Sequence, residues 1–228
     1  MTAELSALHA EIIACRACPR LVEWRERVAR EKRRAYREQT YWGRPVPGFG
    51  DPRARLVIVG LAPAAHGANR TGRVFTGDRS GDFLFAGLHR KGLANQAQSV
   101  HRDDGLVLTD AFIVASARCA PPENKPLPEE LSRCAPFLDR ELALLRPRVL
   151  LALGAIGWDA TLEHFARRGL PVPKPWPKFG HGAEVALAGA PVLLGCYHVS
   201  QQNTQTGRLT PAMFDGILER AKRLLVRK

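Results

Sequence analysis

The chain has 228 residues, of which 45% are hydrophobic and 25% are charged, enough to bury the core of one globular domain over residues 1–228. No apolar run is long enough for a membrane span, and the first residues lack a basic-then-apolar signal, so the sequence predicts a cytoplasmic protein with no membrane partner. The net charge of +12 favours a polyanionic partner such as nucleic acid, although a general excess of arginine would give the same balance.

The first informative feature along the chain is a pair of cysteines, Cys15 and Cys18, which a Cys-x-x-Cys spacing sets on one tight turn. Cys119 and Cys134 supply two more thiols from a distant part of the chain. An all-sulfur site holds zinc or an iron–sulfur cluster, and here it would clasp an N-terminal arm of about 40 residues to the body of the fold. The alternatives are buried core cysteines or a redox pair, and a redox pair would need a preceding strand that this sequence lacks.

Four short runs are apolar on successive residues, a pattern typical of parallel strands covered on both faces. Helical patterns separate these runs, so the sequence predicts a doubly wound α/β sheet, with the Pro-rich residues 171–177 as a surface loop. The predicted strands are residues 55–60, 106–115, 149–153 and 192–196. The predicted helices are residues 21–37, 82–93, 128–145, 156–168 and 211–227.

Polar, Gly/Pro-rich segments follow three of the predicted strands, beginning at His66, Pro121 and His198. Because parallel strands end at one edge of the sheet, these segments should converge on a single crevice. The first segment lacks the glycine spacing of known phosphate-binding loops, so no nucleotide cofactor is predicted. The chain also lacks the Gly-x-Ser-x-Gly turn of an acyl-transfer enzyme.

Four motifs lie at these strand ends: Gly60-Leu-Ala-Pro-Ala64, Gly72-Arg-Val-Phe-Thr-Gly77, Arg118-Cys-Ala-Pro-Pro122 and His198-Val-Ser200. Together with the spaced cysteines, they resemble the uracil-DNA glycosylase superfamily, and within it family five, the type B enzymes. The resemblance implies one three-layer domain with a four-stranded parallel sheet flanked by helices, and a structural [4Fe–4S] cluster on the four cysteines. It also implies a monomer that excises uracil and other deaminated bases, such as hypoxanthine, from DNA during base excision repair.

The same resemblance implies roles for individual residues. His198 is placed to donate a hydrogen bond to the uracil O2 as charge develops there, and Phe75 matches the aromatic ring that stacks on the flipped base. Ala62 lies where much of the superfamily carries a side chain that positions water, so the water activator is open. Asp78 could orient the water, or it could cap the helix that follows it.

Other polar residues of the crevice are predicted to contact the base or the DNA, although histidine and asparagine there could also be ordinary loop residues. Besides Phe75 and Ala62, the predicted base-binding residues are His66 and Asn124. The predicted DNA-binding residues are Asn69, Arg70, Arg73, Lys125, Gln201, Gln202, Asn203 and Arg208. The rival interpretation is a zinc-stapled nucleic-acid-binding protein without activity; a two-metal nuclease is disfavoured because no paired carboxylates stand out.

Overall fold

The computed structural model describes residues 2–226, and these residues build a six-stranded sheet in the order β1-β3-β2-β4-β6-β5. The four central strands are parallel, and their register sets Ile58 of β2 between Ile113 of β3 and Leu151 of β4. The two edge strands are antiparallel and only two residues long. The strands are β1 (Phe49–Gly50), β2 (Leu56–Gly60), β3 (Ala111–Ala115), β4 (Val149–Leu153), β5 (Glu184–Val185) and β6 (Val192–Cys196).

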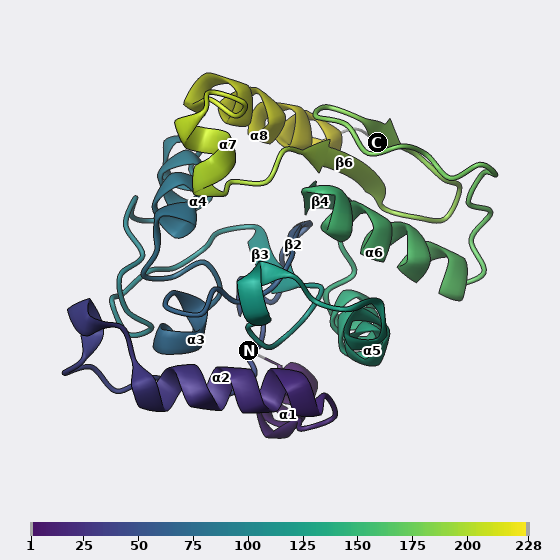
Figure 1. Ribbon diagram of the computed structural model, residues 1–228. Coiled ribbons are helices and arrows are strands. Elements are labelled where there is room, and N and C mark those ends of the chain that lie inside the picture. Colours follow the sequence, from purple (N-terminus) through teal and green to yellow (C-terminus); the bar gives the residue numbers. More distant parts are fainter. Residues whose placement is uncertain (1, 227–228) are drawn as a thin grey trace.

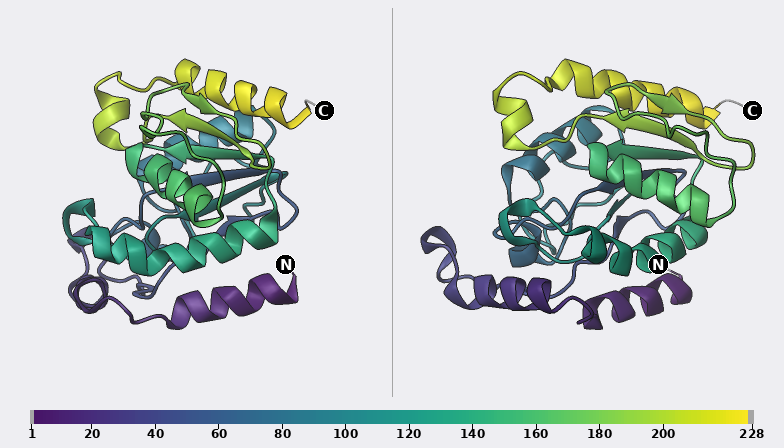
Figure 2. Two further views of the ribbon diagram at one scale, coloured as in Figure 1. Left: turned by 90° about the vertical axis from the view of Figure 1, so that its right-hand side faces the viewer. Right: turned by 45° about the vertical axis from the view of Figure 1, so that its right-hand side comes forward.

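Helices cover both faces of the sheet and complete three layers (Figures 1 and 2). Helices α4 and α8 pack on one face, and α5 and α6 pack on the other, with α1 lying against the outer side of α5. Strands β2 and β4 are fully buried because both of their faces are covered, which explains their unbroken apolar sequences. The α-helices are α1 (Ala3–Ala14), α2 (Pro19–Glu31), α3 (Ala68–Thr71), α4 (Arg79–Arg90), α5 (Pro128–Leu145), α6 (Ala155–Arg167), α7 (Gln201–Gln205) and α8 (Pro211–Val226), and the short 3-10 turns are η1 (Arg34–Tyr36) and η2 (Pro122–Asn124).

The predicted α/β fold is confirmed, with differences at the edges of elements. The sheet has six strands rather than four, because the two short edge strands carry too few residues for a sequence signal. The strand predicted from residue 106 begins only at Ala111, because Asp110 takes a left-handed φ of 55° that interrupts an extended chain. The helix predicted over residues 21–37 ends at Glu31, since Lys32 also turns left-handed with a φ of 55°.

The other predicted helices agree with α4, α5, α6 and α8 to within three residues at each end, and residue 227 lies outside the described residues. Residues 171–177 form a loop, as predicted. No helix within residues 2–226 combines the length and the apolar character that a bilayer crossing requires.

A buried carboxylate ties the N-terminal arm to the body of the fold. Glu141 of α5 is fully buried, and its Oε1 lies 3.1 Å from Nε2 of His9 in α1 and accepts a hydrogen bond from the Gly48 amide. Its other oxygen pairs with the guanidinium of Arg118, just after β3. Burial opposes ionisation of Glu141, but Arg118 and His9 outweigh it and hold its pKa below the usual value. This network fixes the segment that carries Cys119.

Candidate active site

The carboxyl ends of the four parallel strands meet at one edge of the sheet, and the loops that follow them form the candidate site. The connection after β2 passes through α4 on one face, whereas the connection after β4 passes through α6 on the other. Strands β2 and β4 are neighbours, so the loops that follow them diverge at this edge, which is the usual position of the binding crevice in a doubly wound sheet, and we refer to this position as the crevice.

His198 lies in this crevice, two residues beyond the end of β6. Its Cβ packs against Gly154, which follows β4, and its backbone carbonyl accepts a hydrogen bond of 2.8 Å from the Asn203 side chain in α7. Burial lowers the pKa of His198 to about 4. The imidazole is therefore neutral at pH 7, and a neutral ring carries one N–H that can donate a hydrogen bond.

Phe75 faces His198, with 6.2 Å between the ring centroids. The backbone of Phe75 has a φ of 51°, a left-handed conformation that is strained for a bulky residue. Its ring packs onto Gly60 at the end of β2, where an added Cβ would lie 2.8 Å from the ring. Glycine is therefore required at position 60, and the strained loop presents an aromatic ring at the mouth of the crevice.

Asp78 precedes α4 and caps it. Its Oδ1 accepts a hydrogen bond of 3.0 Å from the Gly81 amide, and its Oδ2 faces Gly67 so closely that only glycine fits there. Burial raises the pKa of Asp78, while the amides of Gly81 and Ser80 act in the opposite direction. One carboxylate oxygen thus holds the helix, and the other lies beside the loop that follows β2.

His66 lies in the loop after β2 and contacts Tyr41 at the end of the N-terminal arm. Its Nδ1 lies 3.0 Å from the hydroxyl of Tyr41, and burial, helped by Arg33 and Arg70, lowers its pKa. The ring is therefore neutral near pH 7 and held in one orientation by its tyrosine partner.

The four cysteines Cys15, Cys18, Cys119 and Cys134 come together where the arm meets the body of the fold. Cys15 and Cys18 lie at the end of α1 and the start of α2, Cys119 follows β3, and Cys134 lies within α5. Burial raises the pKa of Cys119 to about 12, and the charges of Cys134 and Cys15 raise it further, so these thiols are neighbours. Nη1 of Arg25 opposes this shift and donates to Cys119 Sγ at 2.8 Å.

All four thiols are free of disulfides, and all except Cys15 are buried. Among residues 2–226, no set of three or more His, Cys, Asp or Glu side chains already stands in an arrangement that would hold a metal ion. The thiols are therefore gathered without forming a preassembled ion site.

Comparison with known proteins gives the family. Residues 47–222 match the family model described as the uracil DNA glycosylase superfamily. The chain belongs to this superfamily. The matched segment begins just before β1 and ends within α8, so it contains the whole sheet and every strand-end loop of the crevice.

Relatives named type-5 uracil-DNA glycosylase resemble almost the whole chain, and they confirm the predicted family. The relative from Mycobacterium tuberculosis is 55% identical over 219 residues, which are 95% of this chain and 80% of that protein. The relative from Thermus thermophilus is 55% identical over 93% of this chain and 94% of its own length. The relative from Pyrobaculum aerophilum is 44% identical over 92% of this chain and 88% of its own.

Three of the residues predicted to bind DNA lie inside this glycosylase fold. Asn69 has no exposed surface and donates through Nδ2 to the carbonyl of Arg25. The guanidinium of Arg70 donates to Gln39 and to the carbonyls of His66 and Gly77. That of Arg73 pairs with Asp104 at 2.7 Å, and its other donors are satisfied by Thr76, Ser99 and the Arg102 carbonyl. This placement argues against phosphate contacts by these three residues, which instead stiffen the loops around the crevice.

Most of the remaining residues predicted to contact the base or the DNA are exposed. Asn124 is exposed in η2, where its backbone φ of 57° is left-handed, and Lys125 is exposed beside Glu123. The guanidinium carbon of Arg208 lies over the Tyr197 ring, 4.8 Å from its centroid. Gln201 and Gln202 are exposed in the first turn of α7, whereas Asn203 is partly buried by its bond to His198. Asn203 is therefore better suited to hold His198 than to enter the DNA.

Two residues that contact predicted site residues were not themselves predicted from the sequence. Tyr41 orients His66, and Arg25 joins Cys119 to Asn69 by donating to the sulfur while its carbonyl accepts from the amide. Both belong to the N-terminal arm, far from the crevice in sequence. Folding brings these two residues into contact with the site residues, and no local sequence motif predicts these contacts.

Proposed function

We propose that the protein is a monofunctional DNA glycosylase that flips uracil out of DNA and hydrolyses its N-glycosidic bond. The observation that carries this proposal is the pairing of Phe75 with a neutral His198 in the strand-end crevice. The identity of 55% to relatives named type-5 uracil-DNA glycosylase supports the same activity. A base within a duplex is inaccessible, so the nucleotide must first leave the stack, at a cost of a few kcal/mol.

The flipped base would stack on Phe75, a contact worth about 1–3 kcal/mol that does not depend strongly on base identity. This tolerance supports the excision of other deaminated bases, hypoxanthine among them. As the bond between C1′ and the base nitrogen breaks, its electron pair moves onto the uracil and charge grows on O2. The N–H of His198 donates to that oxygen. Water then bonds to C1′ and loses a proton, and the uracil anion takes up a proton, so the products are free uracil and an abasic site.

Asp78 is our candidate for the group that orients and deprotonates the water. Its Oδ1 caps the helix, so its Oδ2 would act on the water. We expect Asp78→Asn to retain its stability to within about 0.5 kcal/mol, because asparagine caps helices as well as aspartate does. Excision in single turnover should fall on the order of 10²-fold, because an amide cannot accept the proton. Since burial raises the pKa of Asp78, the acid limb of the wild-type rate profile should lie above the usual carboxylate range. Full activity of the Asp78→Asn variant would show that Asp78 does not activate the water and only caps the helix.

We infer further that Cys15, Cys18, Cys119 and Cys134 hold a [4Fe–4S] cluster. All four potential ligands are sulfur atoms, and three of the four cysteines are buried. Arg25 brings a positive charge that favours thiolates over thiols. When bound, the cluster supplies a crosslink between the arm and the body of the fold, and glycosidic hydrolysis moves no electron through it. The zinc-stapled binding protein is the weaker alternative, because it leaves the Phe75–His198 pair without a role.

The proposed partner is DNA that contains uracil or another deaminated base, and we infer a cytoplasmic enzyme that acts as a monomer. The net charge of +12 supports binding to a polyanion.

The proposed activity is tested by incubating the protein, in EDTA, with an end-labelled duplex that carries one uracil opposite guanine. Half of each sample is then heated in alkali. We expect strand breakage only in the heated half, because a monofunctional glycosylase leaves an abasic site that alkali cleaves. Breakage without alkali would indicate a nuclease or a lyase, and an intact strand in both halves would contradict the proposal.

A further inference from the structure

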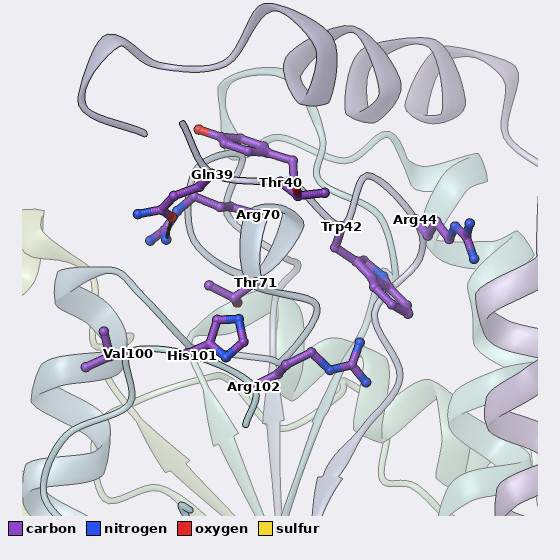
Figure 3. A pocket seen from close by; sticks show the side chains of 10 residues that line it. Gln39, Thr40, Trp42, Arg44, Arg70, Thr71, Val100, His101 and Arg102 are labelled. Carbon is purple, nitrogen blue, oxygen red and sulfur yellow. Dashed lines mark hydrogen bonds between the residues drawn. The ribbon is translucent and has the colours of Figure 1, made fainter. Parts of the chain in front are cut away.

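A second surface, outside the crevice, combines arginine and aromatic side chains. A hollow of about 570 Å³ opens between the segment from Gln39 to Arg44, helix α3 and the loop at Val100–Arg102 (Figure 3). Trp42 lines it with an arginine near its ring on each side: the guanidinium carbon of Arg102 lies 4.7 Å from the ring centroid and that of Arg44 lies 5.7 Å away. None of the ten lining residues is acidic.

A second hollow of about 700 Å³ lies next to the first, because Trp42 and Arg44 line both. The second hollow runs along α1 and α2 and adds Arg16 and Arg30. Its one acidic lining residue, Glu26, is already paired with Arg16. We call the two adjacent hollows the arginine groove. Its positive charge comes from several separate side chains, and one of them, Arg102, also lies near Asp103, with 3.9 Å between Nε and Oδ1 of two exposed side chains.

The groove is held in shape by the buried residues beneath it. The Trp42 indole donates to the Pro45 carbonyl at 3.0 Å, and the Trp42 amide donates to the Arg70 carbonyl at 2.9 Å. On the opposite wall, Arg73 donates to the carbonyl of Arg102 at 3.1 Å. The exposed guanidinium groups of Arg44 and Arg102 therefore extend from fixed backbone, and little backbone ordering would be lost when they bind a ligand.

The groove also adjoins the candidate active site. Tyr41 lines the first hollow, and its hydroxyl bonds to His66 of the crevice. A strand that enters the crevice at one nucleotide could therefore extend across Tyr41 toward Trp42. Guanidinium groups are suited to phosphate because they present several donors in one plane and stay charged.

We propose that the arginine groove binds the phosphodiester backbone of the DNA, away from the flipped nucleotide, through Arg44 and Arg102. This inference rests on the proposed function for its ligand. It assigns DNA affinity to a surface distinct from the Phe75–His198 pair and gives the buried Arg70 and Arg73 a supporting role. Each arginine that neutralises a phosphate releases counterions, so each contact contributes about 0.9 to the slope of log affinity against log salt for a duplex and about 0.7 for a single strand.

The test compares Arg44→Ala/Arg102→Ala with a control that removes the same charge elsewhere. Arg168→Ala/Arg223→Ala is that control, because both arginines are exposed and lie outside the two hollows, Arg168 directly after α6 and Arg223 on α8. Binding to uracil-free DNA is measured over a range of salt concentrations, with a duplex and with one of its strands. We expect the groove variant to lower the duplex slope by about 1.8, from two contacts, and to bind on the order of tenfold more weakly than the control.

Arg44→Lys/Arg102→Lys should recover most of the slope, because the charge returns without the planar fork. A change for the single strand alone would assign the groove to unpaired DNA, and a change for both would assign it to the backbone of either form. Equal slopes for the groove variant and the control would overturn the proposal. Because the DNA lacks uracil, these results do not depend on excision. DNA binding by the arginine groove could therefore be found in a protein that does not excise uracil, and it could be absent from a protein that does.

Discussion

Replacing His198 with alanine is expected to slow uracil excision by about 10²–10³-fold, equivalent to about 3–4 kcal/mol of transition-state stabilisation. The reason is that a neutral imidazole, partly shielded from solvent, donates its hydrogen bond where charge develops and needs little reorganisation of solvent. The measurement is single-turnover excision from a uracil-containing duplex at saturating enzyme. The loss should appear in the rate of the chemical step, while binding of uracil-free DNA stays within a few-fold of wild type.

Two further variants separate this donor from other effects of the substitution. His198→Asn keeps an N–H and should recover part of the rate. His89→Ala removes an exposed histidine of α4 and should leave the rate unchanged. If His198→Ala excised uracil at the wild-type rate, the stabilisation of the leaving group would have to come from elsewhere in the crevice.

The lowered pKa of His198 also predicts that the free energy of unfolding depends on pH. The pKa of His198 is about 4 in the folded protein, below the ordinary value of 6.5. The unfolded chain therefore binds the proton first, and folding stability falls as the pH drops from about 6.5 to about 4. The full shift corresponds to about 3 kcal/mol, less the screening at a side chain that is partly exposed.

His198→Asn should lose less stability than wild type between about pH 7 and about pH 5, as measured by urea unfolding. Burial also lowers the pKa values of His66, His164 and His181, so both proteins should weaken in acid. The difference between the two curves is the contribution of His198.

The sequence was informative where a pattern reflects one physical constraint. Parallel strands covered on both faces need successive apolar residues, so all four central strands were predictable. The joint position of Phe75 and His198 follows from the same topology, because the ends of parallel strands share an edge.

The rest could not be predicted, because its cause is tertiary. An arginine in a strand-end loop looks the same whether it faces phosphate or an internal carbonyl, and only the fold shows that Arg70 and Arg73 are buried. The same holds for Asn69, which is buried and donates to the Arg25 carbonyl. The arginine groove was missed because Arg44 and Arg102 are 58 positions apart and meet only through Trp42.

Because we propose that Cys119 is a ligand of a [4Fe–4S] cluster, replacing it with alanine is expected to abolish iron binding and to release the N-terminal arm, whereas replacing Cys196 should do neither. Both cysteines are buried and free, so the two substitutions delete the same atom from similar surroundings. Cys196 lies in β6 within the core formed with α4 and α8, so its loss should cost about 1 kcal/mol through a small cavity. Cys119 touches Cys18 and Leu21 of the arm, and a structural metal site contributes its binding energy to folding.

The expected loss for Cys119→Ala is therefore several kcal/mol, with α1 and α2 becoming sensitive to protease before the sheet does. The measurements are iron and sulfide content, visible absorbance, thermal unfolding and limited proteolysis, made side by side on the two variants. If the wild-type protein contained zinc instead of iron, the four cysteines would hold a single zinc ion and not a cluster. A Cys119→Ala protein that lacks iron but folds, resists protease and excises uracil like the Cys196→Ala protein would show that the crosslink is dispensable. The arm would then be held by Glu141 and its partners alone.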